Sequence, residues 1–293
     1  MIIITGAAGF IGSQLCRKLN FHGINNIVLV DDFTQERKRK NWEKLEYVDK
    51  IQREHFFLWA EKNVQYIDFI FHLGARTDYF SSDYSIFETL NVDFSQRIWS
   101  FATYKRIPLV YASSYLTNYL PITSNLLPCT SFAKSKMVFD RWIENQQQAP
   151  PFWAGLKFFQ VYGQNEEHKA ENCSEVYKIY RKYTDNVTEI RVENNAIQDY
   201  IYVKDAVKVL YYFLNHAPQS GIYEIGTGFA RPLSAIVEAI NKVAKQEQKL
   251  VLEYQKEAVF TFQADLSKLR RYAYKQAFLP LEQGVKRLYN SFS

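Results

Sequence analysis

The chain has few cysteines, little excess charge and no long apolar run, and each shortage excludes a class of protein. The three cysteines, Cys16, Cys129 and Cys173, are odd in number and include no Cys-x-x-Cys pair. This pattern argues against a disulfide framework and against a zinc site, and it favours a reducing compartment. We therefore expect no metal site and a cytoplasmic location.

Charge and hydropathy argue against two kinds of partner. The chain has 36 Lys and Arg against 31 Asp and Glu, and a net charge of +5 is too small to indicate a nucleic-acid partner. No stretch approaches the ~20 apolar residues of a membrane span. The N-terminal segment lacks the basic stretch followed by a long apolar stretch that is typical of a signal peptide, so we expect none. We expect neither a nucleic acid nor a membrane as a partner.

Three glycines at intervals of three residues follow the first apolar run. Residues 2–5 are β-branched, which is typical of a buried strand. An apolar helical pattern that includes Phe10 and Ile11 begins among the glycines, which are Gly6, Gly9 and Gly12. Strand, glycine turn and helix in this order let the backbone approach a pyrophosphate, whose charge faces the helix N-terminus. A tight turn at a helix–strand contact is the alternative.

An acidic pair supports the first interpretation. A second strand, predicted over residues 26–30, ends in Asp31 and Asp32. Asp31 comes about twenty residues after the turn, where an acidic side chain meets the adenine ribose of a dinucleotide. The sequence therefore predicts a dinucleotide site at the start of the chain.

Strand and helix patterns alternate through the first half. A basic, helix-like stretch covers residues 35–50; later strands are expected at 67–75 and 108–111, and helices at 85–104 and 132–147. Such repeats predict an α/β fold, a Rossmann-like doubly wound parallel sheet with ligands at the carboxyl ends of its strands. We expect a dinucleotide-binding domain over residues 1–160. A smaller substrate-binding region would cover 161–293, with some later segments returning to the first domain.

Three motifs carry a resemblance to a known family. They are Ile4-Thr-Gly-Ala-Ala-Gly-Phe-Ile-Gly12, Tyr111-Ala-Ser-Ser114 and Val161-Tyr-Gly-Gln-Asn-Glu-Glu-His-Lys169. The first two are shared by the extended short-chain dehydrogenases/reductases that act on nucleotide-sugars. The third is similar to a segment of the ADP-glycero-manno-heptose 6-epimerases, which the chain resembles along nearly its whole length.

The resemblance implies an activity and its partners. It implies an epimerase that inverts a carbon of an ADP-sugar or another nucleotide-sugar by transient oxidation, with a dinucleotide that stays bound. Such an enzyme supplies heptose for bacterial lipopolysaccharide, and a homo-oligomer is expected from the family. Asp31 favours NAD, whereas Lys38 and Arg53 stand where the family has basic residues that suit the 2′-phosphate of NADP. We favour NADP and leave NAD open.

The resemblance also assigns roles to individual residues. The implied cofactor contacts are the glycine turn with Phe10 and Ile11, then Asp31, Asp32, Lys38, Arg53, Leu73, Gly74, Ala75, Asn91 and Lys136. The implied catalytic positions are Ser113, Ser114, Phe132, Lys136 and Lys169, and the implied substrate contacts are Gln160, His168, Lys169 and Gln198.

One position departs from the family at the centre of the chemistry. The family has a catalytic tyrosine four residues before the helix lysine, and this chain has Phe132 before Lys136. Phenylalanine keeps the ring and loses the hydroxyl that would move a proton. Three explanations stay open: an engineered change, an epimerase in which Lys169 or a neighbour (Ser113, Ser114, Tyr115, Lys134) carries the proton, or a relative without turnover.

Two further functions stay open beside the epimerase. A binding or regulatory protein that keeps the cofactor is favoured by Phe132, by Gln198 in place of the family's arginine and by Glu224 in place of its asparagine. A dehydratase or reductase acting on another nucleotide-sugar is the second. A 4,6-dehydratase would normally carry Thr-Asp/Glu-Glu after the central strand, which Ser113-Ser-Tyr-Leu-Thr117 lacks.

Overall fold

The computed structural model describes the chain except for residues 120–129, 186, 188, 190–195, 245–259, 273 and 292–293. The chain divides into two compact units. One unit comprises Met1–Lys157 and Val207–Tyr223, and the other comprises Phe158–Ala206 and Glu224–Ser293. Helix α8, Val203–His216, spans a boundary between them.

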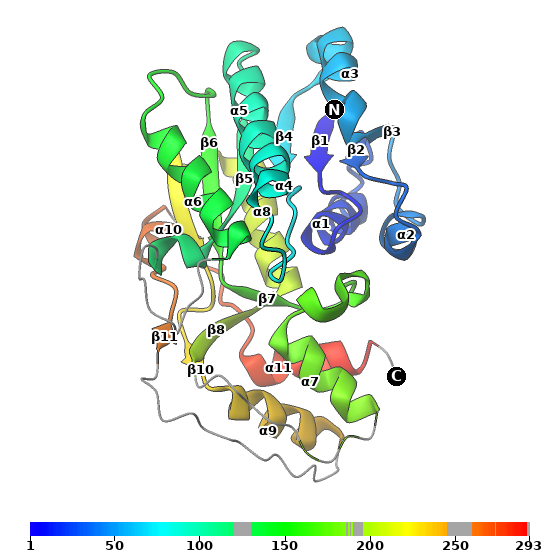
Figure 1. Ribbon diagram of the computed structural model, residues 1–293, viewed down its shortest axis with the longest axis vertical. Coiled ribbons are helices and arrows are strands. Elements are labelled where there is room, and N and C mark those ends of the chain that lie inside the picture. Colours follow the sequence, from blue (N-terminus) through cyan, green and yellow to red (C-terminus); the bar gives the residue numbers. More distant parts are fainter. Residues whose placement is uncertain are drawn as a thin grey trace. The chain divides into compact units, whose positions relative to one another are not determined.

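A seven-stranded sheet with the order β3-β2-β1-β4-β5-β6-β9 forms the first unit's core (Figure 1). Its strands are β1 Ile2–Thr5, β2 Ile27–Asp31, β3 Asp49–Gln52, β4 Phe69–His72, β5 Leu109–Ser114, β6 Trp153–Phe158 and β9 Gly221–Ile225. The pairs from β3 through β5 are parallel, and the strand order reverses at β1 and β4. The expected doubly wound parallel sheet is confirmed, and this reversal is where such sheets bind ligands.

Two groups of helices pack beside this sheet. Besides most of α8, the helices of the first unit are α1 Phe10–Phe21, α2 Arg39–Trp42, α3 Phe56–Asn63, α4 Tyr84–Phe87, α5 Phe94–Tyr104 and α6 Ser131–Glu144. Ring contacts join α3 to α5 through Phe57 and Phe94, with centroids 5.4 Å apart, and α5 to α6 through Trp99 and Trp142. His22 after α1 stacks on Tyr211 of α8 at 4.6 Å.

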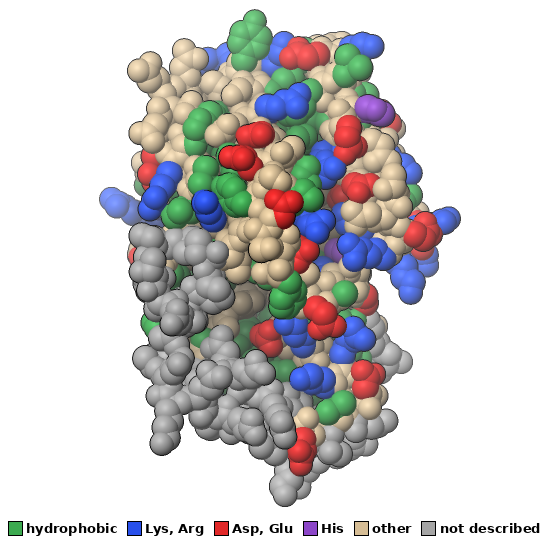
Figure 2. Space-filling view, in the orientation of Figure 1, with side chains coloured by type: hydrophobic (Ala, Val, Ile, Leu, Met, Phe, Trp, Pro, Cys, Tyr) green, Lys and Arg blue, Asp and Glu red, His purple; other side chains and the backbone are tan. Residues whose placement is uncertain are grey.

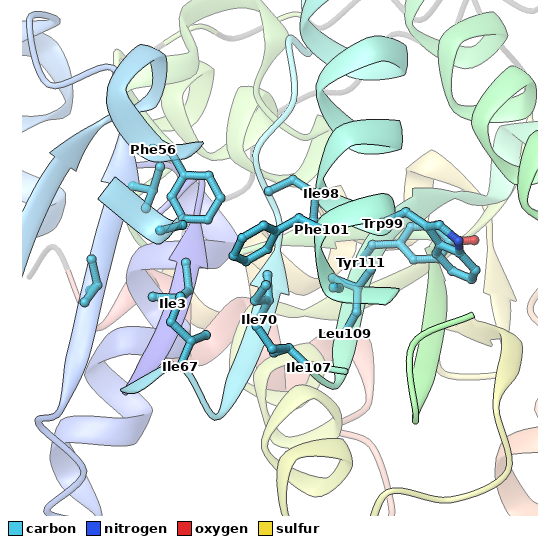
Figure 3. Packing of buried hydrophobic residues seen from close by; sticks show 14 of the residues in the cluster. Ile3, Phe56, Ile67, Ile70, Ile98, Trp99, Phe101, Ile107, Leu109 and Tyr111 are labelled. Atoms are coloured by element: carbon cyan, nitrogen blue, oxygen red, sulfur yellow. The ribbon is translucent and has the colours of Figure 1, made fainter. Parts of the chain in front are cut away.

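The core lies between the sheet and the α3–α5–α6 group (Figure 3). Ile3, Ile70 and Leu109 from three neighbouring strands are completely buried. They belong to one apolar cluster with Phe56 and Ile98 of the helices. β1 and β4 are buried at every residue. Strands that are covered on both faces have continuous apolar runs rather than alternating apolar and polar residues.

The structure differs from two of the elements that the sequence predicted. The helix expected over 85–104 is interrupted by a π-helical segment, Glu88–Asp93, between α4 and α5. The helix-like interpretation of residues 35–50 is wrong at its end, because Asp49–Gln52 is strand β3. This strand lies at the sheet edge and is only partly buried, so its single apolar residue, Ile51, left no strand pattern in the sequence.

In its described residues, the second unit holds a smaller sheet and four helices. Its strands are β7 Gln160–Tyr162, β8 Ile197–Tyr202, β10 Ala230–Arg231 and β11 Thr261–Phe262, with β8 pairing with each of the others. Its helices are α7 Glu175–Thr184, α9 Leu233–Ala244, α10 Ser267–Arg271 and α11 Leu281–Tyr289. None of the described helices combines the length and the apolar character needed to cross a membrane.

Candidate active site

The glycine turn joins β1 to α1 with very close backbone packing. Gly6 has φ +71°, and a Cβ on it would lie 2.6 Å from the Cα of Gly74 after β4. A Cβ on Gly12 would lie 2.2 Å from the Gly6 carbonyl oxygen. Both glycines are therefore required by packing, whatever the turn binds.

The start of α1 has the features of an anion site. Gly9 is its N-cap and gives no side-chain hydrogen bond, and the first turn has no acidic residue. The first N–H groups of a helix lack partners within the helix and carry the positive end of its dipole. Phe10 is buried and Ile11 is half-buried. Both side chains are apolar, so the polar groups at these two positions are those of the backbone. The turn fits the pyrophosphate of a dinucleotide.

The carboxylate of Asp31 is held by the chain itself. It accepts hydrogen bonds from the Ala8 N–H at 2.9 Å and from the Asp32 N–H at 2.7 Å. The ammonium of Lys38 lies 2.9 Å from the same side chain, which is 6% exposed. Hydrogen bonds from Thr34 and Gln35 lower the pKa of the Asp32 carboxyl to about 2. The structure thus brings Asp31 and Lys38 together.

Basic side chains surround this pair. Arg37 to Lys40 run through the short 3-10 turn Glu36–Lys38 and into α2, and Figure 2 shows blue side chains gathered in this region. Arg53 forms an ion pair with its neighbour Glu54 at 2.6 Å. Lys38 is therefore the basic residue for which the structure gives a direct bond to Asp31.

The residues that follow β4 are hydrogen-bonded to the end of β1. The N–H of Leu73 bonds the Thr5 carbonyl at 3.1 Å, and the N–H of Gly74 bonds the Thr5 hydroxyl at 3.2 Å. Leu73, Gly74 and Ala75 are half-buried at this edge. They follow β4 at the carboxyl end of the strand, next to the end of β1.

Asn91 connects two parts of the site. It lies in the π-helical segment and is 1% exposed. Its amide accepts from the Arg76 N–H at 2.7 Å and donates to the Arg76 carbonyl at 3.0 Å and to the Ser135 hydroxyl at 2.9 Å. Asn91 thereby fixes the segment after β4 against α6. π-Helical insertions occur often at functional sites.

Lys136 is buried on α6 beside the end of β5. Its ammonium donates to the Ala112 carbonyl at 2.8 Å, and the residue is 4% exposed. Burial lowers the pKa of this ammonium to about 8, although the Asp140 carboxylate opposes the shift. Phe132, one turn earlier, is also buried and packs against Tyr79.

Asp140 is a buried group that the sequence reasoning missed. Its carboxylate accepts from the Ser113 hydroxyl at 2.7 Å and from the Tyr111 hydroxyl at 3.1 Å. Burial raises its pKa, and the Ser113 hydrogen bond opposes the increase. The available signal was its position four residues after Lys136, on the same helix face. Ser114, beside Ser113, accepts from the Leu116 N–H at 3.3 Å.

The second unit holds the other expected residues. Lys169 lies in the 3-10 segment Glu167–Asn172, and its N–H bonds the Glu166 carbonyl at 2.8 Å. The His168 ring lies 3.0 Å from the Asn165 carbonyl. On neighbouring strands, the Gln160 amide donates to the Gln198 side chain at 2.6 Å. The structure therefore pairs these two glutamines and places His168 and Lys169 in one turn.

Glu166, next to this turn, is a second buried group that the sequence reasoning missed. It is completely buried, and its carboxylate accepts from the Gly163 N–H at 2.8 Å and from the N–H and hydroxyl of Ser174 at 2.7 and 2.9 Å. Burial raises its pKa, and the charge of Lys169 opposes the increase. Within the described ranges, no three His, Cys, Asp or Glu side chains are arranged to hold a metal ion.

Comparisons with known proteins give the family. A model described as the NAD dependent epimerase/dehydratase family matches residues 2–226. The ADP-L-glycero-D-manno-heptose-6-epimerase of Fusobacterium nucleatum is 33% identical and covers 98% of this chain and 96% of that protein. The Brachyspira hyodysenteriae protein of the same name is 31% identical with the same coverage.

A solved structure agrees with the fold. The Helicobacter pylori ADP-L-glycero-D-manno-heptose-6-epimerase superposes with a TM-score of 0.85 over 99% of this chain and 95% of that chain, at 21% identity. At that identity the likeness concerns the fold, whereas the family model and the two relatives above 30% concern ancestry. They confirm the resemblance drawn from the glycine turn, Tyr111–Ser114 and the His-Lys segment. The chain belongs to the NAD-dependent epimerase/dehydratase family.

Proposed function

We propose that the chain is a nucleotide-sugar epimerase that inverts C6 of ADP-glycero-manno-heptose. The observation that carries this proposal is the 33% identity over 98% of the chain to a curated 6-epimerase. The His168-Lys169 turn, held by a buried glutamate, supports it. The product would serve lipopolysaccharide assembly.

The dinucleotide would be held by the first unit. The uncapped start of α1 suits its pyrophosphate, and the half-buried edge from Leu73 to Ala75 suits its nicotinamide half. Asn91 and Lys136 lie at the adjoining segments. When bound, the dinucleotide would supply reversible hydride transfer at the sugar carbon.

NADP is the dinucleotide that we propose. A carboxylate offers about four acceptor positions, and Asp31 uses three, for Ala8, Asp32 and Lys38. One position stays for a ribose hydroxyl, and the Lys38 ammonium keeps two N–H donors for a 2′-phosphate. NAD remains the alternative, because Asp31 by itself favours a free ribose hydroxyl.

Acid/base and substrate-contact roles are proposed for the following residues. Lys169 is proposed to move one of the two protons that the reaction needs, and Gln160, His168 and Gln198 are proposed to contact the nucleotide-sugar. The Ser113 hydroxyl donates a hydrogen bond to the Asp140 carboxylate at 2.7 Å. The Ser113 oxygen could therefore accept a hydrogen bond from the reacting hydroxyl. Ser114 is the second candidate for that contact.

A binding protein without turnover is the second candidate function, and Phe132 is the observation that favours it. Both functions are tested by purifying the chain, identifying the dinucleotide that acid releases, and following C6 inversion of the ADP-heptose by NMR. Epimerisation supports the enzyme. A bound dinucleotide with no inversion, in the chain as it stands and in Phe132→Tyr, supports the binding protein. Gel filtration of the same preparation tests the expected homo-oligomer.

A further inference from the structure

Tyr79 lies directly against Phe132. The ring centroids are 5.2 Å apart, and the planes meet at 73° in an edge-to-face contact. Phe132 is buried at 6% exposure, whereas Tyr79 is 40% exposed on the segment that follows β4. A phenol therefore packs on the ring that lacks a hydroxyl, from a segment 53 residues earlier in the chain.

The segment that carries Tyr79 is anchored to the helix face that carries Lys136. Asn91 forms two hydrogen bonds with Arg76, three residues before Tyr79, and a third with Ser135, the residue before Lys136. Phe132 and Lys136 are four residues apart and share a face of α6. A ring packed on Phe132 therefore contacts α6 one helical turn before the residue that carries the buried ammonium.

Other groups near this face are engaged elsewhere. The Ser113 hydroxyl donates to Asp140 at 2.7 Å. The Lys134 ammonium lies 4.2 Å from the centroid of the Tyr84 ring. The Tyr115 ring packs on Tyr119. The Tyr79 ring is in direct contact with Phe132.

We propose that the Tyr79 hydroxyl is a catalytic acid/base of this enzyme and does the work for which residue 132 has no hydroxyl. The inference rests on the proposed epimerase function. Oxidation of a carbinol needs an acceptor for the hydroxyl proton while the hydride leaves the carbon. Tyr79 as phenolate takes that proton as the C–O bond becomes C=O and the dinucleotide takes the hydride. Reduction of the carbonyl's other face returns the hydride from the dinucleotide, and Lys169 supplies the proton on that face. Tyr79 then releases its proton to solvent and Lys169 regains one, so each turnover balances without an external oxidant.

The cation one helical turn from Phe132 makes this role chemically reasonable. A nearby positive charge favours the charged form of an acidic group, and Lys136 supplies a buried ammonium on the shared face. A phenol normally ionises near pH 10, so the phenolate needs such a neighbour to be present at neutral pH. The Phe132 ring supplies the apolar surface on which the Tyr79 ring rests.

The first test compares Tyr79→Phe with Tyr84→Phe in the holoenzyme. Tyr84 lies on α4, five residues later, and serves as the matched control. We expect Tyr79→Phe to lower kcat for epimerisation by about 10²–10⁴, with the bound-dinucleotide content unchanged. Tyr84→Phe should stay within about twofold of the parent. The double variant Tyr79→Phe/Phe132→Tyr should regain much of the lost rate, because the hydroxyl returns from the other ring.

The second test needs no turnover. The absorbance of the holoprotein at 295 nm is titrated against pH, and tyrosinate formation near neutral pH should be present in the parent and absent in Tyr79→Phe. Its absence in the parent would contradict the proposal.

The outcomes separate this inference from the proposed function. Full activity of Tyr79→Phe overturns the role of Tyr79 and leaves the epimerase standing. A parent that is inactive while Phe132→Tyr is active does the same. If neither turns over, the proposed epimerase function fails, and the 295 nm titration alone decides whether Tyr79 is an activated phenol.

Discussion

The ammonium of Lys38 lies 2.9 Å from the carboxylate of Asp31, in a pair whose acidic member is almost completely buried. The carboxylate also receives the Ala8 N–H of the glycine turn. One ion pair thus connects the end of β2, the glycine turn and the basic segment before α2, where we propose that the adenosine end of the cofactor binds.

Replacing Lys38 should change the preference between the two dinucleotides. Lys38→Gln removes the cation proposed to contact the 2′-phosphate, and a hydrogen bond to a charged group contributes about 1.5–3 kcal/mol. We expect NADP binding to weaken by about 10–150-fold and NAD binding by less than about threefold, measured by calorimetry on protein freed of cofactor. Lys40→Gln, which alters an exposed lysine on α2, is the control. Equal losses for both dinucleotides would contradict the proposal for NADP.

Lys169→Met should remove turnover and keep the cofactor. If Lys169 moves a proton in the reaction, kcat should fall by about 10²–10⁴. KM for the nucleotide-sugar should change much less, because Gln160, His168 and Gln198 would keep their contacts. Steady-state kinetics with quantified dinucleotide content make the measurement. Lys178→Met is the control, because Lys178 forms an ion pair with Glu175 at 2.9 Å on α7. A kcat near the parent value would remove Lys169 from the mechanism.

Glu166→Gln should loosen the His168-Lys169 turn. Glutamine keeps the shape but offers one oxygen where the glutamate uses both for three donors of Gly163 and Ser174. Leaving a buried donor without its partner costs about 1–3 kcal/mol. Urea unfolding should show a loss of that size, and kcat should fall with it. The exposed neighbour provides the control, Glu167→Gln, which should change neither. An unchanged unfolding midpoint would show that the buried carboxylate does not hold the turn.

Stability should depend on pH through His72. The ring lies between the hydroxyls of Thr5 and Ser95 at 2.7 and 2.8 Å. Burial, with the charge of Lys136, lowers its pKa to about 3. The folded state keeps His72 neutral, whereas the unfolded chain binds a proton below pH ~6.5. Stability from this group is therefore present above that pH and is lost as pH falls toward 3, by up to about 1.4 kcal/mol per pH unit.

Unfolding in urea at pH 7.5 and 5.5 measures this dependence. His72→Asn should be less stable at pH 7.5, because the bond to one hydroxyl is lost, and should show a smaller loss between the two pH values. His55→Gln, at an exposed position, should keep the parent's pH dependence. An identical dependence in His72→Asn and the parent would assign the acid sensitivity to other groups.

Local patterns were sufficient for the glycine turn and the parallel strands. Ile2–Thr5 is apolar throughout because both faces of β1 are covered, and such a run is visible in the sequence. Strand β3 was not predicted from the sequence, for the opposite reason. It lies at the edge, where partial exposure requires no continuous apolar run.

The sequence predicted where a residue lies more readily than which groups its side chain bonds. Asn91 was expected near the cofactor, but the π-helical segment that turns it toward both Arg76 and Ser135 has no sequence signal that we recognised. Lys136 and Asp140 have a helical spacing that can be counted. The bonds that Asp140 receives from Ser113 and Tyr111 depend on how α6 packs on β5.

The sequence by itself determined the class of sheet, the family and the absence of a hydroxyl at Phe132, because each follows from residue types at short, fixed spacings. Only the tertiary structure decided that Asp31 is held by Lys38, that Glu166 closes the turn of Lys169 and that Tyr79 packs on Phe132. These contacts join segments through turns and packing between elements, and the side chain that reaches a given atom there is set by the path of the whole chain rather than by neighbouring residues.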